Sequence, residues 1–516
     1  MKSKITFILI LLSAFFIRFY GINWDQGFHL HPDERMLIMV AERIKFFSNL
    51  NPDFFNYGSL PIYLLRIIAP NGHYDSLLIS GRILSVGFDL LTIILIYRIG
   101  QLLFKKNKIS LLSSLLYTVA FFPIQNSHFF VVDVFLNTFV TGLIYILLVY
   151  SKSPSIKKAI ILGLVFAAMM ATKFTAIIFL PIIIVVILWK TMKQWKNSAI
   201  SLITFHFSLL TFYFLFMPYA FIQHQQFFVD LSTQLKMNSN PYIFPYTLQY
   251  VGTVPYLYYL KNIFFWGLGP IFSILSIVGL YQISKSKNIL FLIFYFLYFL
   301  AIGRSAVKFM RYMLPLYPFF ALLAGYGLYK IYERNKLFAY MLVTCILLWS
   351  FTFINIYSLP HTRIAATEWI LKNVPEGAAI ATEHWDDGMP LYGGEKYLRQ
   401  ELTLYDQPDG ENKWKILDEK LRKTDYIIIA SNRLYIPLQK LNDCKKYKSC
   451  YPITSKYYQK LFSEKLGFKK VAEFTTYPKL EIGNWKLEIR DDVADESFTV
   501  YDHPKIMIFK KNEKNN

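Results

Sequence analysis

Long uninterrupted apolar runs dominate the sequence and constrain its fold more than any other feature. A run of about 17–25 apolar residues is long enough to cross the hydrocarbon core of a bilayer as a helix. Eleven spans are expected, at residues 5–22, 77–104, 109–125, 128–150, 157–172, 174–190, 198–218, 261–283, 289–303, 312–330 and 337–356. The sequence therefore predicts a polytopic α-helical membrane protein.

The charges are distributed unevenly along the chain. Only 17% of residues are charged, below the roughly one quarter that is usual for soluble proteins. The net charge of +21 divides into +19 for residues 1–356 and +2 for residues 357–516. The basic residues of the apolar part occur in short clusters between the runs, as the positive-inside rule describes for membrane proteins. This distribution argues against nucleic-acid binding, which a basic total could otherwise indicate.

The basic clusters also predict the orientation of the chain. If eleven spans alternate, six clusters fall on one side, namely the N-terminal Met1–Lys4, 105–108, 151–158, 190–196, 284–287 and 330–336. Glu333 is the only acid in these clusters, so this side is expected to be the cytoplasm. The first apolar run could be a cleaved signal peptide, but no small-residue cleavage site follows it, so it is expected to be a transmembrane helix. The chain is thus expected in the cytoplasmic membrane, with its N-terminus inside and residues 357–516 outside.

Two domains are expected. Residues 1–356 form the transmembrane domain, whose first outside loop at 23–75 is unusually long. Residues 357–516 mix strand-like runs, such as 426–430 and 505–509, with amphipathic helical stretches at 365–373 and 457–466, which is typical of an α+β domain.

The chain has three cysteines. Cys444 and Cys450 lie outside the membrane in this prediction, where they could form a disulfide or remain free thiols. Cys345 lies in an apolar run and is expected to pack in the core. No Cys-x-x-Cys or His-Glu-x-x-His spacing indicates a structural metal.

The first outside loop contains two adjacent acids, Asp33 and Glu34. Pro32 before them is suited to the first turn of a helix, where the positive end of the helix dipole favours carboxylates. The following stretch, Met36–Phe47, is amphipathic and is expected to lie in the membrane interface. The two acids are either catalytic carboxylates at the outer surface or simple helix-capping residues.

A third acid and several cations are expected near the same surface. Asp133 lies near the outer end of an apolar run, where a carboxylate marks either a functional site or a buried ion pair. The cations are Arg82, Lys173, Arg304, Lys308 and Arg311. Such residues are unusual on the outside, so they indicate a bound anion such as a phosphate, or anchoring to lipid headgroups. Arg82 could alternatively pair with Asp89, two helical turns further on.

Several motifs resemble those of one enzyme superfamily. They are His31-Pro32-Asp33-Glu34, Asn51–Tyr57 followed by Ser59-Leu60, Arg311–Pro318, Thr362–Ile370 and Ala494–Pro504. In this order they resemble bacterial members of the protein O-mannosyltransferase superfamily, which are phospholipid-carrier-dependent glycosyltransferases of the GT-C fold. Lipid A aminoarabinose transferase is a relative, but its Lys-Pro-Pro stretch is replaced here by Tyr57–Pro61, which disfavours lipid A as the acceptor.

The resemblance implies an inverting transfer of a sugar from a polyprenyl-phosphate donor to a hydroxyl of a protein or glycolipid. Asp33 matches the catalytic base best, with Glu34 beside it, and Asp133 matches the family's second acidic site. The donor phosphate is expected to bind among Arg82, Lys173, Lys308 and Arg311, and the substrate cavity is expected to include His31, Tyr57 and Tyr312.

No cofactor is required by this chemistry, although Asp33, Glu34 and His31 could hold a divalent cation. The main alternative is a multi-span transporter or flippase of a lipid-linked or anionic substrate. A receptor or scaffold that works through residues 357–516 is a third reading. The crowding of ionisable residues at the outer interface, rather than at the midplane, favours the enzyme.

Overall fold

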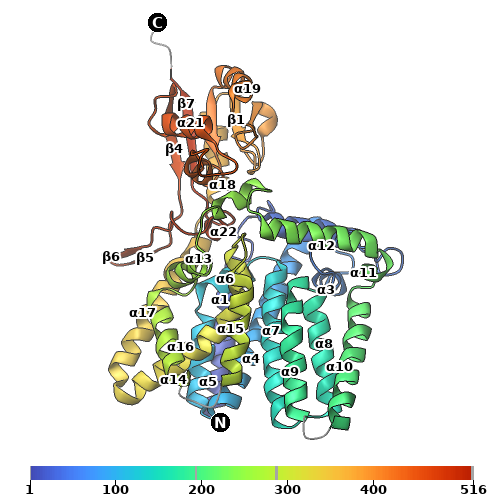
Figure 1. Cartoon of the computed structure of the whole chain (residues 1–516). Coiled ribbons are helices and arrows are strands. Elements are labelled where there is room, and N and C mark those ends of the chain that lie inside the picture. The colour runs from blue at the N-terminus through green and yellow to red at the C-terminus, as the bar shows by residue number, and fades with distance from the viewer. Residues whose placement is uncertain (1, 192–194, 285–288, 513–516) are drawn as a thin grey trace. The chain divides into compact units, whose positions relative to one another are not determined.

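A computed structural model describes residues 2–191, 195–284 and 289–512 (Figure 1). The chain divides into two compact units. The first, the membrane unit, comprises residues 1–23, 31–236 and 254–354, and the second, the soluble unit, comprises 24–30, 237–253 and 355–516. The sequence predicted that the second domain begins at residue 357, whereas the last segment of the soluble unit begins at residue 355.

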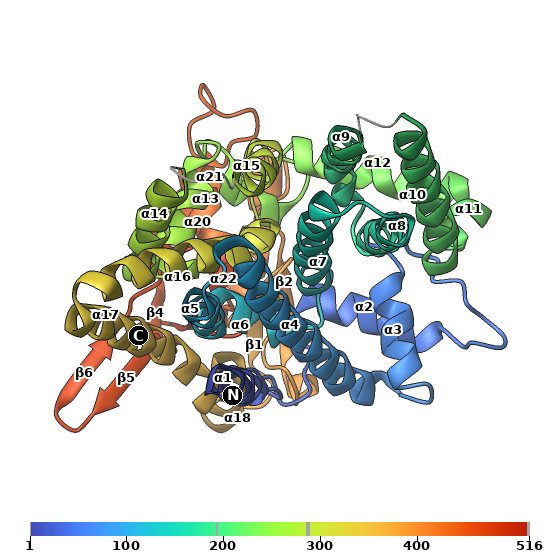
Figure 2. The same ribbon diagram turned by 90° about the horizontal axis from the view of Figure 1, so that it is seen from below.

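The membrane unit consists of helices. They are α1 (Lys2–Phe19), α2 (Pro32–Arg43), α3 (Leu60–Ile68), α4 (Tyr74–Phe104), α5 (Asn107–Thr118), α6 (Phe121–Ser127), α7 (Val132–Lys152), α8 (Ile156–Met170), η1 (Phe174–Phe179), α9 (Leu180–Thr191), α10 (Trp195–Phe216), α11 (Tyr219–Ile222), α12 (His224–Ser239, whose last residues belong to the soluble unit), α13 (Leu257–Asn262), η3 (Ile263–Gly267), α14 (Pro270–Ser284), α15 (Ile289–Gly303), η4 (Met310–Leu316), α16 (Tyr317–Arg334) and α17 (Lys336–Ile354). In the view from below, α4 lies between α5 and α7, and α8 lies beside α7 and α10 (Figure 2).

Helix is present in each of the eleven predicted ranges, which confirms the polytopic helical fold. By length and composition, five segments of the described chain could each cross a membrane alone, and α5 with α6, bent by 58°, would make a sixth. The predicted span at 261–283 is not one continuous helix, because it is divided between α13, η3 and α14, with Gly269 at φ +82° between the last two. The count of eleven spans remains a prediction.

Glycines allow two of these helices to approach closely. A Cβ on Gly279 of α14 would lie 1.9 Å from the carbonyl oxygen of Leu323 on α16. A Cβ on Gly327 of α16 would lie 2.5 Å from the carbonyl oxygen of Leu275 on α14. Small residues that let backbones meet are typical of helix contacts inside membranes, where no hydrophobic force drives association.

Loops that were predicted on the same side of the membrane contact one another. Lys106 lies 3.4 Å from Glu333, and the Lys152 ammonium donates to the carbonyl of Leu102 at 3.4 Å. At the opposite end of the bundle, the amide of Gly58 donates to the carbonyl of Thr172 at 3.0 Å. These contacts agree with the predicted alternation of the loops between the two sides of the membrane.

Cys345 corrects one expectation. Its side chain is exposed on α17 rather than packed in the core. In an apolar helix of a membrane protein, an exposed face can contact lipid, so the apolar run alone did not identify which face of the helix was buried.

The soluble unit is built around a five-stranded mixed sheet of order β2-β1-β3-β7-β4. The strands are β1 (Ala379–Glu383), β2 (Leu398–Leu402), β3 (Tyr426–Ile429), β4 (Phe468–Phe474) and β7 (Ile506–Lys511). β1 is parallel to both β2 and β3, whereas β7 is antiparallel to β3 and β4. A separate hairpin joins β5 (Lys479–Ile482) to β6 (Trp485–Glu488). The predicted α+β class is confirmed, and the predicted strands correspond to β3 and β7.

Helices cover both faces of this sheet. The remaining elements are η2 (Pro245–Tyr250), η5 (Asn355–Ser358), α18 (Thr362–Asn373), η6 (Gly394–Lys396), α19 (Glu411–Arg422), α20 (Tyr435–Lys440), α21 (Pro452–Phe462) and α22 (Glu496–Thr499). Ile427 and Ile429 of β3 pack with buried residues of α19, α20 and α21, whereas Ile428 packs with residues of α18. All four residues of β3 are buried because successive side chains point to opposite, covered faces.

Residues 237–253 belong to the soluble unit although they lie between helices of the membrane unit in the sequence. Leu248 and Val251 are part of the soluble core beside α20. Gln249 and Glu496 are joined reciprocally, since the Gln249 amide donates to the carboxylate at 3.0 Å and accepts from the Glu496 backbone N–H at 3.1 Å. The long loop before α13 is thus a structural part of the soluble unit.

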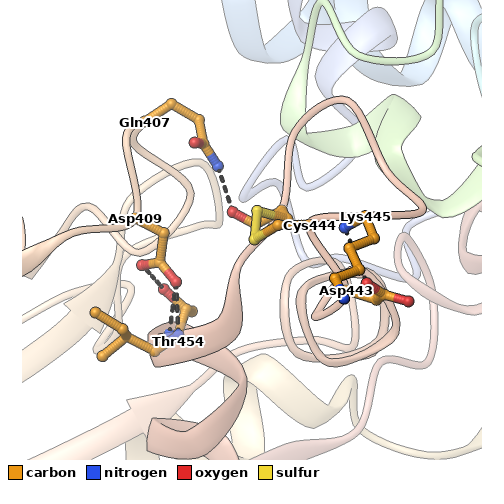
Figure 3. Close-up of a disulfide and its surroundings, with 8 residues drawn as sticks. Gln407, Asp409, Asp443, Cys444, Lys445 and Thr454 are labelled. Atoms are coloured by element: carbon orange, nitrogen blue, oxygen red, sulfur yellow. Dashed lines mark hydrogen bonds between the residues drawn. A yellow bond between two sulfur atoms is a disulfide. The ribbon is translucent and has the colours of Figure 1, made fainter.

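Cys444 and Cys450 form a disulfide, which the sequence had left open (Figure 3). Beside it, the side chain of Gln407 donates to the carbonyl of Cys450 at 2.9 Å. Asp409 accepts from the backbone N–H groups of Ile453 and Thr454 at 2.8 and 3.0 Å, at the start of α21. The disulfide and these bonds fix the loop that leads into α21.

Candidate active site

The first turn of α2 places the two adjacent acids of the first outside loop. His31 is the N-cap, and its ring nitrogen Nδ1 accepts from the Glu34 backbone N–H at 3.4 Å. Pro32 begins the helix as expected, because a missing N–H costs nothing in the first turn. Neighbouring positions on a helix point in different directions, so Asp33 and Glu34 reach different surroundings.

Asp33 belongs to a chain of alternating charges contributed by four segments. The Arg311 guanidinium Nη2 lies 2.8 Å from Asp33 Oδ2, and its Nε lies 3.6 Å from Asp133 Oδ2. Lys173 Nζ lies 2.7 Å from the other oxygen, Asp133 Oδ1. We call Asp33, Arg311, Asp133 and Lys173 the charge cluster. Residues from α2, α7, the turn before η1 and η4 are thereby brought to one place.

Solvent access differs along the charge cluster. The side chain of Asp33 is 26% exposed, whereas those of Arg311 and Lys173 are 10% and 12% exposed and that of Asp133 is 3% exposed. Asp133 has a cation at each oxygen and is nearly buried, so it is suited to holding Lys173 and Arg311 in position. Asp33 is the carboxylate that an incoming molecule can reach.

Aromatic residues surround the cluster. The Tyr57 hydroxyl donates to Asp33 Oδ1 at 3.2 Å. Burial, together with the negative charge of Asp33, raises the pKa of Tyr57 well above its ordinary value, so Tyr57 stays a hydrogen-bond donor. Lys173 Nζ lies 4.3 Å from the centroid of the Tyr312 ring, and the Arg311 guanidinium lies 4.6 Å from that of Phe309. These cation–π contacts orient both cations.

Gly58 explains how Tyr57 reaches this position. A Cβ at Gly58 would lie 1.9 Å from the carbonyl oxygen of Ala171, so only glycine allows this approach. The backbone N–H groups of Gly58 and Leu60 donate to the carbonyls of Thr172 and Ala171, both at 3.0 Å. The first outside loop is thereby fastened to the turn that carries Lys173.

Two predicted site residues lie elsewhere. Glu34 and Arg82 form a fully buried bidentate pair, with distances of 2.9 and 2.7 Å, and Glu34 also accepts from the Phe130 backbone N–H at 2.8 Å. Such a pair is suited to fixing α2 on α4 rather than to meeting a substrate. Their predicted catalytic and phosphate-binding roles remain predictions that this burial disfavours.

The alternative pairing of Arg82 with Asp89 is wrong. Asp89 pairs instead with Arg18 of α1, and it accepts from the Tyr117 hydroxyl at 2.6 Å. The Asn137 amide donates to the same hydroxyl at 2.7 Å, so the four side chains form one buried network between α1, α4, α5 and α7. Sequence analysis missed this network, since an Arg and an Asp on separate helices carry no spacing signal.

The remaining predicted residues are placed as follows. The ring of His31 lies 4.7 Å from that of Phe129, and the Lys308 ammonium, on a buried residue, donates to the carbonyl of Ala306 at 3.0 Å. Of the predicted site residues, the structure brings together Asp33, Asp133, Lys173 and Arg311, with Tyr57 and Tyr312 beside them.

Asp33, Glu34 and His31, which could have held a divalent cation, are not arranged as a metal site in the part of the chain that the structure describes. The Glu34 oxygens already accept from Arg82 and the Phe130 N–H, and His31 Nδ1 accepts from the Glu34 N–H. Within residues 2–191, 195–284 and 289–512, no group of three or more His, Cys, Asp or Glu side chains is arranged to hold a metal ion.

Comparison with known proteins supports the resemblance found in the sequence. The model of the dolichyl-phosphate-mannose-protein mannosyltransferase family matches residues 74–219, which include Asp133 and Lys173. A search of curated proteins gives no match.

The fold resembles solved structures at low sequence identity. The apo oligosaccharyltransferase of Archaeoglobus fulgidus aligns with a TM-score of 0.51 and 12% identity, covering 84% of this chain and 71% of the other. ArnT of Cupriavidus metallidurans, solved bound to undecaprenyl phosphate, aligns with a TM-score of 0.48 and 11% identity, covering 84% and 94%. The family match and the first of these structures confirm the predicted superfamily resemblance and the GT-C fold.

Proposed function

We propose that this protein is an inverting glycosyltransferase that moves a sugar from a polyprenyl-phosphate donor to a hydroxyl of a protein or glycolipid. The charge cluster carries the proposal, because it joins an accessible carboxylate to two fixed cations. Residues 74–219 match the dolichyl-phosphate-mannose-protein mannosyltransferase family, and this match supports a lipid-phosphate sugar as the donor.

The reaction follows from the roles that the cluster allows. Asp33 accepts the proton of the acceptor hydroxyl, and that oxygen attacks the anomeric carbon of the donor. The bond from this carbon to the phosphate oxygen breaks on the opposite face, so the configuration inverts and the carrier leaves as lipid phosphate. The proton stays on Asp33 until it passes to water.

Arg311 and Lys173 stabilise the charge that grows on the leaving phosphate. A guanidinium has five N–H donors, so Arg311 can contact carboxylates and a phosphate together. Asp133 and the aromatic rings hold both cations before the substrate arrives, and such preorganised electrostatics are usually the largest catalytic contribution. We assign no step to a divalent cation.

The positions of Asp33 and Lys173 along the chain favour an enzyme over a transporter or flippase. A transporter needs its ionisable groups at a midplane site that opens alternately to both sides. Asp33 and Lys173 instead lie in loops or helix ends, in the segments predicted outside. The proposal accordingly places the protein in the cytoplasmic membrane with its N-terminus inside and the soluble unit outside.

Replacement of each of the adjacent acids tests the proposal. The rate of sugar transfer from a synthetic polyprenyl-phosphate sugar is measured for wild type, Asp33→Asn and Glu34→Gln in proteoliposomes. General-base assistance is worth about 10²–10⁴-fold, so Asp33→Asn is expected to lower kcat by that range with little change in donor affinity. Glu34→Gln is compared with it per amount of folded protein, and its kcat is expected to fall less, because Glu34 is buried against Arg82 and cannot accept the proton of an acceptor. Wild-type turnover by Asp33→Asn would show that Asp33 is not the base.

A further inference from the structure

A cluster of aromatic side chains belongs to the soluble unit and includes none of the residues used in the proposed reaction. It consists of Phe244, Tyr246, His384, Trp385 and Tyr405, and we call it the aromatic platform. Phe244 and Tyr246 come from the segment 237–253, whereas the other three come from the loops that follow β1 and β2. Three separate stretches of sequence therefore supply its rings.

The rings contact one another around Trp385. Its centroid lies 5.8 Å from that of Tyr405, 6.4 Å from that of Tyr246 and 6.5 Å from that of Phe244. Phe244 and Tyr246 are stacked at 5.3 Å, and His384 and Tyr405 are stacked at 6.2 Å. Trp385 remains 38% exposed at the centre of this arrangement.

The backbone holds Trp385 in this position at an energetic cost. Its φ angle is +77°, a conformation that bulky residues rarely adopt. Two neighbours fix the turn, since Arg433 donates to the carbonyl of Trp385 at 3.2 Å and Arg363 lies 3.0 Å from the carboxylate of Asp386. Strain of this kind persists where the surroundings impose it, and it is frequent at ligand sites.

Polar groups lie beside the aromatic faces. His384 Nδ1 and Glu401 Oε1 are 2.7 Å apart, and their side chains are 38% and 61% exposed. The edge of the platform thus offers hydrogen-bonding groups in reach of solvent, next to rings that offer flat apolar faces.

A sugar ring matches this pairing of surfaces. The C–H groups on one face of a pyranose are polarised positively by the adjacent oxygens, and they stack on the negative face of an aromatic ring. The hydroxyl groups at the rim of the sugar need hydrogen-bonding partners, and His384 and Glu401 can supply them. A lipid chain has no hydroxyl groups that would use these partners. None of the five platform side chains is a lysine or an arginine, and the adjacent Arg433 and Arg363 are paired with Glu496 and Asp386 rather than offered to a phosphate.

We infer that the aromatic platform is a carbohydrate-binding site of the soluble unit that takes a hexopyranose residue by stacking on Trp385. This inference goes beyond the proposed transfer reaction, because it concerns binding of a saccharide without a lipid phosphate. Its failure would leave the transfer assay above unaffected, so the two can be distinguished.

Equilibrium binding to the full chain in nanodiscs tests the inference. The probes are mannotriose and cellotriose, titrated by calorimetry in the absence of donor, with an unglycosylated Ser/Thr-rich peptide as the comparison ligand. Trp385→Ala and Phe244→Leu remove rings from two separate segments, and Trp385→Phe retains a ring. Trp485→Ala is the matched control, since Trp485 is 46% exposed on β6 and has no part in the platform.

At least one trisaccharide is expected to bind wild type and Trp485→Ala equally. Trp385→Ala should weaken that binding by about tenfold or more, which corresponds to the loss of one stacked ring. Phe244→Leu and Trp385→Phe should weaken it less. Binding of neither trisaccharide, equal losses in Trp385→Ala and Trp485→Ala, or binding of the peptide alone would overturn the inference.

Discussion

Two adjacent carboxylates have opposite environments in this protein. Glu34 is fully buried against Arg82, whereas Asp33 is partly exposed and lies against Arg311. One helical position separates them, and this is enough to turn one acid into the bundle and the other toward the charge cluster. The same sequence motif therefore supplies both a structural acid and a candidate base.

Glu34→Gln is expected to destabilise the protein strongly. Removing one partner of a buried ion pair leaves the other charge uncompensated, which costs about 3–5 kcal/mol. Thermal unfolding of the purified protein should therefore shift to markedly lower temperature for Glu34→Gln than for Asp33→Asn. A larger shift for Asp33→Asn would contradict the structural role given to Glu34.

His503 makes the stability of the soluble unit depend on pH. Burial opposes its charged form, but the carboxylates of Asp502 and Asp491, at 2.5 and 2.9 Å, raise the pKa of His503 to about 10. The unfolded chain would titrate near pH 6.5, so the stabilisation is complete below that pH and is lost as pH rises toward 10. Between pH 6.5 and 9.5, the unfolding temperature should fall more for wild type than for His503→Gln. An equal fall in both proteins would show that the ion pairs of His503 do not contribute to the pH dependence of the unfolding temperature.

At the residue scale, the sequence singled out side chains that lie together in the candidate site, but it did not predict their ion-pair partners. Asp33, Asp133, Lys173 and Arg311 stood out because charged groups are costly beside apolar runs. The partner of Arg82 could not be found in this way, because Asp89 on the same helix satisfied the spacing rule while Glu34, 48 positions away, forms the contact. Pairing between helices depends on packing that single-sequence periodicity does not encode.

At the scale of elements, a short loop positions the site. The loop that ends at Gly58 lies against the turn before η1, and it carries Tyr57 to Asp33. The contact lies between the start of α3 and the turn after α8, so the geometry depends on two backbone hydrogen bonds and on the missing side chain of Gly58.

Gly58→Ala is expected to lower the transfer rate by about 10²-fold, since a displacement of about 1 Å near reacting groups can cost that much. Its Cβ would lie 1.9 Å from the Ala171 carbonyl oxygen, so the loop must move and take Tyr57 with it. Gly87→Ala on α4 is the control, because a Cβ there meets nothing within 4 Å. The initial rate of transfer in proteoliposomes measures both. Similar rates for the two variants would argue against this role of the loop.

Elements with strong periodicity were predicted well, and those that depend on tertiary contacts were not. Apolar runs such as 289–303 coincide with α15, since length and composition alone define such a helix. The division of 261–283 by Gly269 and the incorporation of 237–253 into the soluble unit were missed. Leu248 and Val251 look like ordinary loop residues until the core that they join is known.

At the scale of the whole molecule, a helical unit holds the charge cluster and a soluble unit carries the aromatic platform. Composition and the positive-inside rule indicated this division, because the membrane part holds nearly all of the net charge. The GT-C fold is confirmed by comparison, whereas the identity of the sugar and acceptor depends on surfaces that composition does not describe.

The most direct test of the account is a structure of Asp33→Asn in a nanodisc with an intact polyprenyl-phosphate sugar. The account predicts the phosphate within hydrogen-bonding distance, about 3 Å, of Arg311 and Lys173, with the anomeric carbon facing residue 33. A donor phosphate bound away from Arg311, with residue 33 directed away from the sugar, would contradict it.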